Sequence, residues 1–239
     1  MRALPAAVSF LTVVGRGQRP DAAATAWFGF VGAGIGLALG AAWDGLGEVW
    51  SPALAAALIV LLDLLVTGAL HLDGLADSGD GLLPHATRER RLEIMRAPDV
   101  GAFGVAVVVV MLLVRFAALA GLEADVWMLV APWAAARVAA SLTMRLAPYA
   151  RTDGLASSFL GTAGRSLVAV DLVVLAAVIA VAAAVDGVAG VAGVAVGVVA
   201  FGAVVALAIR RLGGFTGDVL GAGIVVGETA ALVTLAGSW

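Results

Sequence analysis

The sequence contains no cysteine and no lysine, and it has only one tyrosine and two histidines among 239 residues. The lack of cysteine excludes disulfide bonds and metal sites built on thiolates. All fourteen basic residues are arginine, which we attribute to a coding bias toward arginine and alanine. Charged residues make up only 13% of the chain, and a net charge of −3 is too small to indicate a nucleic-acid partner.

Apolar residues dominate the composition. The chain is 62% hydrophobic, with a mean hydropathy of +1.08. A soluble core cannot absorb that much apolar surface, so the composition predicts an all-α polytopic integral membrane helical bundle. We expect a single membrane-embedded domain over residues 1–239. Residues 1–20 are only mildly apolar and lack an A-x-A site, so they do not indicate a cleaved signal peptide.

About seven segments are apolar over roughly the 20 residues that a spanning helix needs. They are 27–43, 52–70, 101–122, 126–147, 167–185, 188–209 and 219–237. The division between the fifth and the sixth rests on "VDGVAG" at 185–190.

Charges in the connecting loops alternate in sign. Arginines precede the first span and fill every second loop after it: Arg2, Arg16, Arg19, Arg88, Arg90, Arg91, Arg96, Arg145, Arg151, Arg165, Arg210 and Arg211. The other loops hold acids: Asp44, Glu48, Glu123, Asp125 and Asp186. Basic loops favour the cytoplasmic side. The pattern therefore predicts a cytoplasmic N-terminus, an external C-terminus and motif-bearing loops that face the cytoplasm.

Glycines recur at four-residue spacing, at Gly32, Gly36 and Gly40 and again near the last span at Gly217 and Gly221. In lipid this spacing lets helices approach closely. The contact is either between helices of one chain or a seam between two copies, so a homo-oligomer is possible on this pattern.

The stretch "HLDGLADSGDG" at 71–81 places three aspartates in an apolar chain. If it continues the second span as a helix, Asp73, Asp77 and Asp80 project from one face. Stacked carboxylates repel, so either some are protonated or a cation lies among them. Oxygen-only ligands indicate a hard cation such as Mg²⁺. The alternative is a solvated acidic loop. His71 points to another face and could orient a carboxylate or contact substrate.

The segment "TRERRLEIMR" at 87–96 predicts a short amphipathic helix in the same loop. Arginine binds phosphate bidentately, so we expect Arg88, Arg91 and Arg96, with Glu93, to contact a substrate phosphate. The alternative is that these arginines mark topology and touch anionic lipid headgroups.

The segment "RRLGGFTGDVLGAG" at 210–223 leads into the last span. Gly213 and Gly214 expose backbone N–H groups at a helix start, where anions bind. Thr216 could cap the helix, with Asp218 in its first turn. Asp218 then becomes a candidate fourth metal ligand. The alternative is an ordinary capped helix start.

Five isolated charges fall within the apolar segments: Asp63, Arg115, Arg137, Asp171 and Glu228. Such residues are either functional or paired with one another inside the bundle.

These motifs together resemble the cobalamin synthase family, whose members are adenosylcobinamide-GDP ribazoletransferases. The resemblance rests on "HLDGLADSGDG", "RERRLEIMR", "GAFG" and "GGFTGD" with a following "LGA", and it runs from "SFLT" at 9–12 to "GETAAL" at 227–232. It implies a Mg²⁺-dependent enzyme of the inner membrane. That enzyme joins adenosylcobinamide-GDP to α-ribazole, or to its 5'-phosphate, and releases GMP. A more distant likeness to CDP-alcohol phosphotransferases also implies divalent metal on helical aspartates.

One position departs from the family pattern. Members usually read "EIMRD", but here Ala97 follows Arg96, and an acid returns only at Asp99. This chain therefore lacks the carboxylate that other members carry directly after this arginine.

The resemblance implies a displacement in which the ribazole hydroxyl attacks the phosphorus on the cobinamide side. Asp73, Asp77 and Asp80 would hold metal, and one of them, Asp80 for instance, would accept the proton. Two alternatives remain. A lipid-making CDP-alcohol phosphotransferase is disfavoured because Asp77 stands where its motif has arginine. A cation-coupled transporter would place its acids near the midplane.

Overall fold

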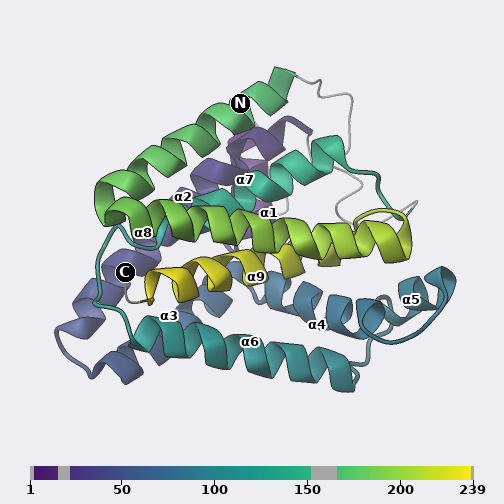
Figure 1. The fold of residues 1–239 in the computed structure, drawn as a ribbon, viewed down its shortest axis with the longest axis horizontal. Helices are drawn as coiled ribbons and strands as arrows, with labels where there is room; N and C mark the ends of the chain where they lie inside the picture. The colour runs from purple at the N-terminus through teal and green to yellow at the C-terminus, as the bar shows by residue number, and fades with distance from the viewer. Residues whose placement is uncertain (1–2, 16–21, 152–165, 238–239) are drawn as a thin grey trace.

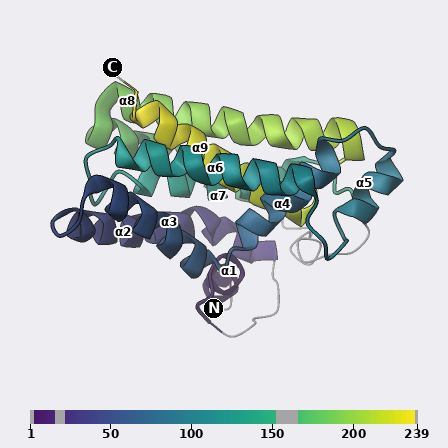
Figure 2. The same cartoon turned by 90° about the horizontal axis from the view of Figure 1, so that it is seen from below.

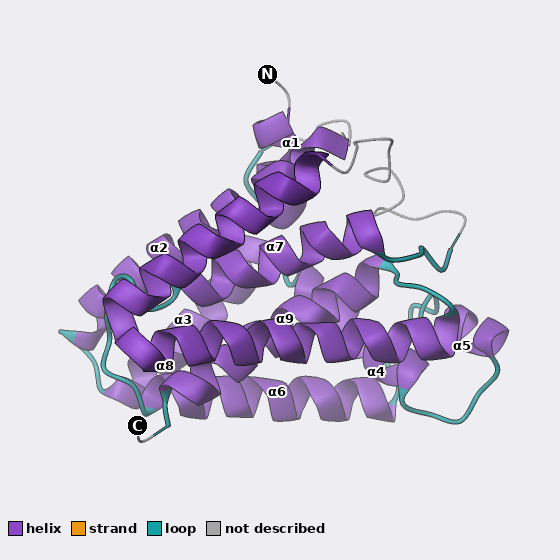
Figure 3. Cartoon of the chain, turned by 45° about the horizontal axis from the view of Figure 1, so that its top comes forward, coloured by secondary structure: helices purple, strands orange, loops and turns teal. Residues whose placement is uncertain are grey.

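The computed structural model describes residues 3–15, 22–151 and 166–237, and every element in that part is a helix (Figure 1; Figure 3). The elements are α1 Ala3–Leu11, the 3₁₀ helix η1 Ala22–Trp27, α2 Phe28–Gly47, α3 Pro52–Thr67, α4 Leu70–Leu82, α5 Arg88–Ile94, α6 Ala102–Ala120, α7 Val130–Leu146, α8 Ser166–Leu212 and α9 Gly217–Leu235. The predicted all-α class is confirmed. Four of the loop arginines, Arg2, Arg16, Arg19 and Arg165, lie outside the described residues.

Within the described ranges, four helical stretches are long and apolar enough to cross a membrane. They are Ala22–Gly47, Ala102–Ala120, Leu167–Leu212 and Gly217–Leu235, and the bent pair Pro52–Thr67 with Leu70–Leu82 would make a fifth. These helices support a membrane protein. The predicted number of seven spans and the predicted orientation stay predictions.

The motif segment is helical, but its helix does not continue the second span in a straight line. Gly68 and Ala69 both adopt left-handed backbone angles, with φ of 61° and 56°. Gly68 ends α3 by donating its N–H to the Leu64 carbonyl. The chain restarts as α4 at an angle of 92° to α3. The motif aspartates therefore lie on a separate helix.

The predicted division of the long apolar region at 185–190 is confirmed. Helix α8 contains non-helical angles at Gly187, where φ is 58° and ψ is −131°. The break divides α8 into two arms of different direction, and the second arm runs alongside α9 (Figure 1).

Glycines let neighbouring helices of this chain pack tightly. A Cβ atom at Gly32 would lie 3.0 Å from the Cα atom of Ala134, and one at Gly223 would lie 2.8 Å from the ring of Phe201. Gly32 of α2 therefore faces α7, and Gly223 of α9 faces α8. Helix α9 packs against α4, α6, α7 and α8 and forms the centre of the bundle.

The loops of opposite charge lie at opposite ends of the molecule. Figures 1 and 2 show α5 at one end and the bend of α8 at the other. At the α5 end, Arg88 donates to the carbonyl of Leu212 at 2.7 Å. At the other end, Asp186 lies close enough to Asp125 for the two charges to interact.

Candidate functional site: a carboxylate cavity between α4 and α9

A cavity of about 170 Å³ lies where α1, α2, α4 and α9 meet. Its polar lining consists of His71, Asp73, Tyr149, Arg151 and Asp218. The remaining lining is apolar or glycine: Phe10, Leu11, Phe28, Leu70, Ala140, Gly217, Leu220, Gly221 and Ile224. We call this space the carboxylate cavity. The structure thus brings together three of the predicted site residues, His71, Asp73 and Asp218, from two distant parts of the sequence.

Two glycines bring the helices of the cavity into backbone contact. A Cβ atom at Gly74 would lie 2.7 Å from the carbonyl oxygen of Asp218. A Cβ atom at Gly221 would lie 3.1 Å from the Cα atom of His71. Any side chain at either position would push α4 away from α9. The close approach places Asp73 and Asp218 at the same cavity.

The carboxylates here form a group with one counter-charge. Asp77 is half-buried and interacts electrostatically with Asp218, Asp73 and Arg151. Asp218 forms an ion pair with Nη2 of Arg151 at 3.0 Å. It also accepts a hydrogen bond from the Thr216 hydroxyl at 3.2 Å. Counting the described residues alone, three acids share one nearby arginine, so their summed charge is negative.

Asp80 has different neighbours, although it lies on the same face of α4. Its carboxylate is buried and accepts hydrogen bonds from the backbone N–H groups of Gly101, at 2.6 Å, and Gly104, at 2.8 Å. These donors belong to the start of α6, where N–H groups lack helical acceptors. Asp80 therefore caps α6, a role that the sequence did not predict.

The donor chemistry of Asp73, Asp77 and Asp218 fits a hard divalent cation. All three offer carboxylate oxygens, which Mg²⁺ prefers, and their mutual repulsion falls when a cation binds. In the described part of the chain, however, no three acidic or histidine side chains are already gathered closely enough to form a metal site. Side-chain rotation would have to complete it.

Arg88 is engaged with the backbone. Its Nε donates to the carbonyl of Leu212 at 2.7 Å, and its Nη2 donates to the carbonyl of Ala150 at 3.2 Å. It therefore ties the end of α8 to the segment before Arg151. These two contacts give Arg88 a structural role. Its predicted contact with a substrate phosphate stays a prediction.

Arg91 is also bound to carbonyl groups. It donates to the carbonyls of Gly81 at 2.8 Å, Leu82 at 2.9 Å and Ala86 at 3.1 Å. Burial lowers the pKa of the Arg91 guanidinium, and the nearby charge of Arg211 lowers it further. Arg91 therefore caps the end of α4, because the last carbonyls of a helix lack donors.

The other predicted residues of α5 point to solvent. Glu93 pairs with Arg90 at 3.0 Å, and both side chains are 65% exposed. Arg96 is exposed as well. The predicted helix at 87–96 is confirmed as α5, with the Thr87 hydroxyl accepting from the N–H of Arg90. None of these side chains lines the carboxylate cavity.

The glycine segment before α9 has the predicted capped start. The Thr216 hydroxyl accepts from the N–H of Val219, and Asp218 lies in the first turn. Gly213 has a φ of 78°, which favours glycine. Gly214 lies directly against the chain at 148–150, where Phe215 bonds to Pro148. Gly213 and Gly214 thus shape the turn that positions Asp218.

Sequence reasoning missed part of the lining. Arg151 was considered only as a topological charge, and Tyr149 was not considered. The two apolar residues of α1, Phe10 and Leu11, were also missed. A signal was available for Arg151, because it is a loop arginine on the predicted cytoplasmic side. Nothing in the sequence places it beside Asp218.

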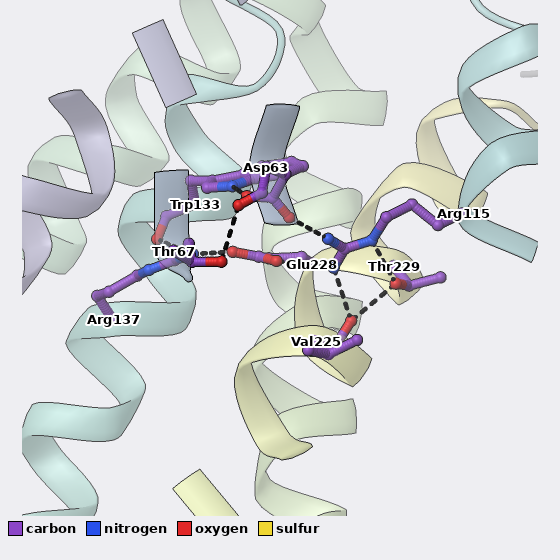
Figure 4. Close-up of polar contacts among 8 residues, drawn as sticks. All are labelled: Asp63, Thr67, Arg115, Trp133, Arg137, Val225, Glu228 and Thr229. Atoms are coloured by element: carbon purple, nitrogen blue, oxygen red, sulfur yellow. Dashed lines mark hydrogen bonds and ion pairs between the residues drawn. The ribbon is translucent and has the colours of Figure 1, made fainter. Parts of the chain in front are cut away.

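A second polar group lies deeper in the bundle (Figure 4). Arg115 pairs with Asp63 at 2.6 Å and with Glu228 at 2.7 Å, and it donates to the Thr229 hydroxyl at 3.0 Å. Arg137 pairs with the other oxygen of Glu228. We call Asp63, Arg115, Arg137 and Glu228 the buried ion network. It joins α3, α6, α7 and α9, and its formal charges cancel.

The fifth isolated charge is also paired. Asp171 of α8 accepts from Nε of Arg145 at 2.7 Å and from the hydroxyl of Ser141. All five isolated charges of the apolar segments therefore have a partner of opposite sign. Of the two alternatives, pairing inside the bundle is the one that the structure supports.

Comparison with known proteins identifies the family. The model of the cobalamin-5-phosphate synthase family matches residues 3–236. The adenosylcobinamide-GDP ribazoletransferase of Chlorobaculum tepidum is 37% identical over 96% of this chain and 91% of its own length. That of Bradyrhizobium diazoefficiens is 40% identical over 78% of this chain and 72% of its own. No solved structure matches. This chain belongs to the cobalamin-5-phosphate synthase family.

Proposed function

We propose that this chain is an adenosylcobinamide-GDP ribazoletransferase. It transfers the adenosylcobinamide phosphate group to α-ribazole, or to α-ribazole 5'-phosphate, with release of GMP, in the final steps of cobalamin synthesis. The observation that carries the proposal is the carboxylate cavity in a chain that the family model matches almost end to end. The names of its relatives support the same reaction.

The reaction asks mainly for positioning and for stabilisation of negative charge. The 5'-hydroxyl of the ribazole attacks the phosphorus attached to cobinamide. A new O–P bond forms, the P–O bond to GMP breaks, and GMP leaves with the bonding electrons. Because Asp80 already accepts two backbone hydrogen bonds, Asp73 and Asp77 are the candidate bases for the hydroxyl proton.

The cavity is suited to a magnesium ion as cofactor. Asp73, Asp77 and Asp218 would hold it, and bound Mg²⁺ supplies charge neutralisation at the pyrophosphate. Arg151 and His71 would then face the substrate from the same cavity. The two apolar side chains from α1, Phe10 and Leu11, limit access of water to the reacting atoms.

We further propose seven spans in the cytoplasmic membrane, with the N-terminus and the carboxylate cavity on the cytoplasmic side. The four long apolar stretches, the second arm of α8 and the bent pair α3–α4 counted as one make six spans. Helix α7, with 17 residues, would be the seventh, at the lower limit of a spanning length. The grouping of arginine loops at the α5 end and of Asp125 and Asp186 at the other end supports that orientation.

Two other functions fit less well. A CDP-alcohol phosphotransferase would act on a lipid alcohol, and neither the family model nor the relatives' names point to one. A cation-coupled transporter would use intramembrane acids as its site. Here Asp63 and Glu228 are already neutralised by Arg115 and Arg137.

The proposal is tested by GMP release from the purified full-length chain in detergent. We expect release that needs adenosylcobinamide-GDP, a ribazole acceptor and Mg²⁺ together. Asp77→Asn should lower the rate by about 100-fold or more, because it removes a charge at the reacting group. Asp44→Asn is the matched control and should leave the rate unchanged, because Asp44 is an exposed acid of α2 that neither lines the cavity nor is coupled to Asp77. Absence of GMP release from the unmodified chain would overturn the proposal.

A further inference from the structure

We infer that Arg151 binds a phosphate of the nucleotide substrate and exchanges its ion pair with Asp218 for that phosphate. The inference rests on the proposed function for the identity of the substrate. It assigns a binding role to a residue outside the sequence motifs, in place of the α5 arginines that those motifs favour.

The first support is the position of Arg151. Its side chain lines the carboxylate cavity and is only 11% exposed. Nη2 lies 3.0 Å from a carboxylate oxygen of Asp218 and 3.2 Å from the carbonyl of Met95. The guanidinium is therefore held at the cavity wall by one acidic and one neutral partner.

The second support is an unused donor. Nε of Arg151 is buried and has no hydrogen-bond partner. Buried donors are normally satisfied, and each exception needs an explanation. Nε and one Nη group form the planar edge with which arginine grips two oxygens of a phosphate. In Arg151 this edge has an acceptor at Nη2 and none at Nε.

The third support is the commitment of the other arginines. Arg151 is the only arginine that lines the carboxylate cavity among residues 3–15, 22–151 and 166–237. Arg88 and Arg91 donate to backbone carbonyls at helix ends. Arg115 and Arg137 belong to the buried ion network.

The charge balance explains why an exchange is needed. Asp73, Asp77 and Asp218 together repel a pyrophosphate, and among the described residues Arg151 is the counter-charge that Asp77 and Asp218 share. If a cation takes over Asp218, the guanidinium loses its acidic partner. A phosphate oxygen replaces that partner, and Nε gains an acceptor at the same time. The Arg151–Asp218 pair thus keeps both groups neutralised until metal and nucleotide bind.

The test uses GDP as a probe and the full chain in detergent. Binding is measured by calorimetry with and without Mg²⁺, and steady-state GMP release is measured in parallel. For Arg151→Gln we expect GDP affinity to fall by about 10- to 100-fold, which corresponds to losing a charge-assisted hydrogen bond. The KM for adenosylcobinamide-GDP should rise by a similar factor, and the KM for α-ribazole should not change. Arg90→Gln, the same substitution in an exposed arginine of α5, is the control.

A second variant gives an effect of opposite sign. Without Mg²⁺, Asp218→Asn releases Arg151 from its ion pair, so metal-free GDP binding should tighten by several-fold. Relief of the repulsion by Asp218 would also tighten binding, so the gain must be lost in the double variant Asp218→Asn/Arg151→Gln if it comes from the freed guanidinium. Arg151→Lys keeps the charge but lacks the planar edge. Its affinity for GDP should lie between that of the unmodified chain and that of Arg151→Gln. It also serves if Arg151→Gln does not fold.

The outcomes separate the two proposals. If the unmodified chain releases GMP while Arg151→Gln and Arg151→Lys bind GDP normally, the role of Arg151 is overturned and the enzyme assignment stands. If GDP binding depends on Arg151 but no GMP is released, the assignment fails and the binding role stands. No change in metal-free affinity for Asp218→Asn would overturn the exchange.

Discussion

The carboxylate cavity and the buried ion network use the same residue types for opposite purposes. The network has two acids and two arginines, side chains at most 8% exposed, and a net charge of zero. The cavity is lined by two acids, Asp73 and Asp218, with Asp77 close to both and one arginine among the described residues, and Asp73 is exposed. Each charge of the network has an ionic partner of opposite sign, whereas the described acids at the cavity outnumber the arginines.

This contrast separates structure from function inside one bundle. Buried charges are stable only when they are paired and hydrogen-bonded. The network is ion-paired throughout and joins four helices, although Nε and Nη2 of Arg137 have no hydrogen-bond partner. At the cavity the described charges do not balance, which is why we propose a cation for the acids and a phosphate for the arginine.

The largest effect is expected when one charge of the buried ion network is removed. Glu228→Gln leaves two buried arginines with a single acid, Asp63. We expect a loss of about 3–5 kcal/mol in the free energy of unfolding, because removing one partner leaves an uncompensated buried charge. Thermal unfolding in detergent measures it.

A second substitution provides the control for this effect. Adding Arg137→Met to Glu228→Gln restores neutrality, since Arg115 and Asp63 still pair at 2.6 Å. The double variant should therefore recover part of the lost stability. If Glu228→Gln alone unfolds at the same temperature as the unmodified chain, the network is not structural.

A smaller effect is expected at the contact that builds the cavity. Gly74→Ala forces a methyl group against the backbone of Asp218. We expect a loss of about 1–3 kcal/mol from overpacking and a drop in GMP release, because the acids of α4 and α9 move apart. Gly45→Ala, a helical glycine with open space around it, is the control and should not lower stability. Unchanged GMP release in Gly74→Ala would mean that the close approach is not needed.

The smallest effect should come from a pair outside both regions. Arg90 and Glu93 are 3.0 Å apart but 65% exposed. Arg90→Gln should change the free energy of unfolding by no more than about 0.5 kcal/mol, since water screens such pairs. The same unfolding assay measures it. If Arg90→Gln lowered the free energy of unfolding as much as Glu228→Gln, burial could not explain why the two ion pairs differ.

The helices could be predicted largely from apolar periodicity and length. The division of α8 was visible in "VDGVAG", and α5 in its amphipathic pattern. The break between α3 and α4 was missed, because Ala69 in a left-handed conformation has no local sequence signal. Helix α1 was missed because it has only 9 residues.

The site was predictable where residues share a motif and not where tertiary contacts decide. Asp73 and Asp218 were expected to lie together, and they line one cavity. The spacing that puts Asp80 on the same face could not show that α6 would start beside it. The arginines of α5 are of the type that binds phosphate, but Arg88 and Arg91 donate their hydrogen bonds to carbonyls at helix ends. The residue types in the sequence indicate the class of ligand, and tertiary packing decides which side chains are free to bind it.

The break at Gly68 and Ala69 has an electrostatic consequence. A straight helix from 52 to 82 would have no N-terminus near the motif, whereas the break creates one at Leu70. The start of α9 at Gly217 reaches the same cavity. Each helix start carries roughly half a positive charge from its aligned peptide dipoles. Two macrodipoles thus converge on the aspartates, so the backbone itself lowers the cost of keeping them ionised beside a membrane.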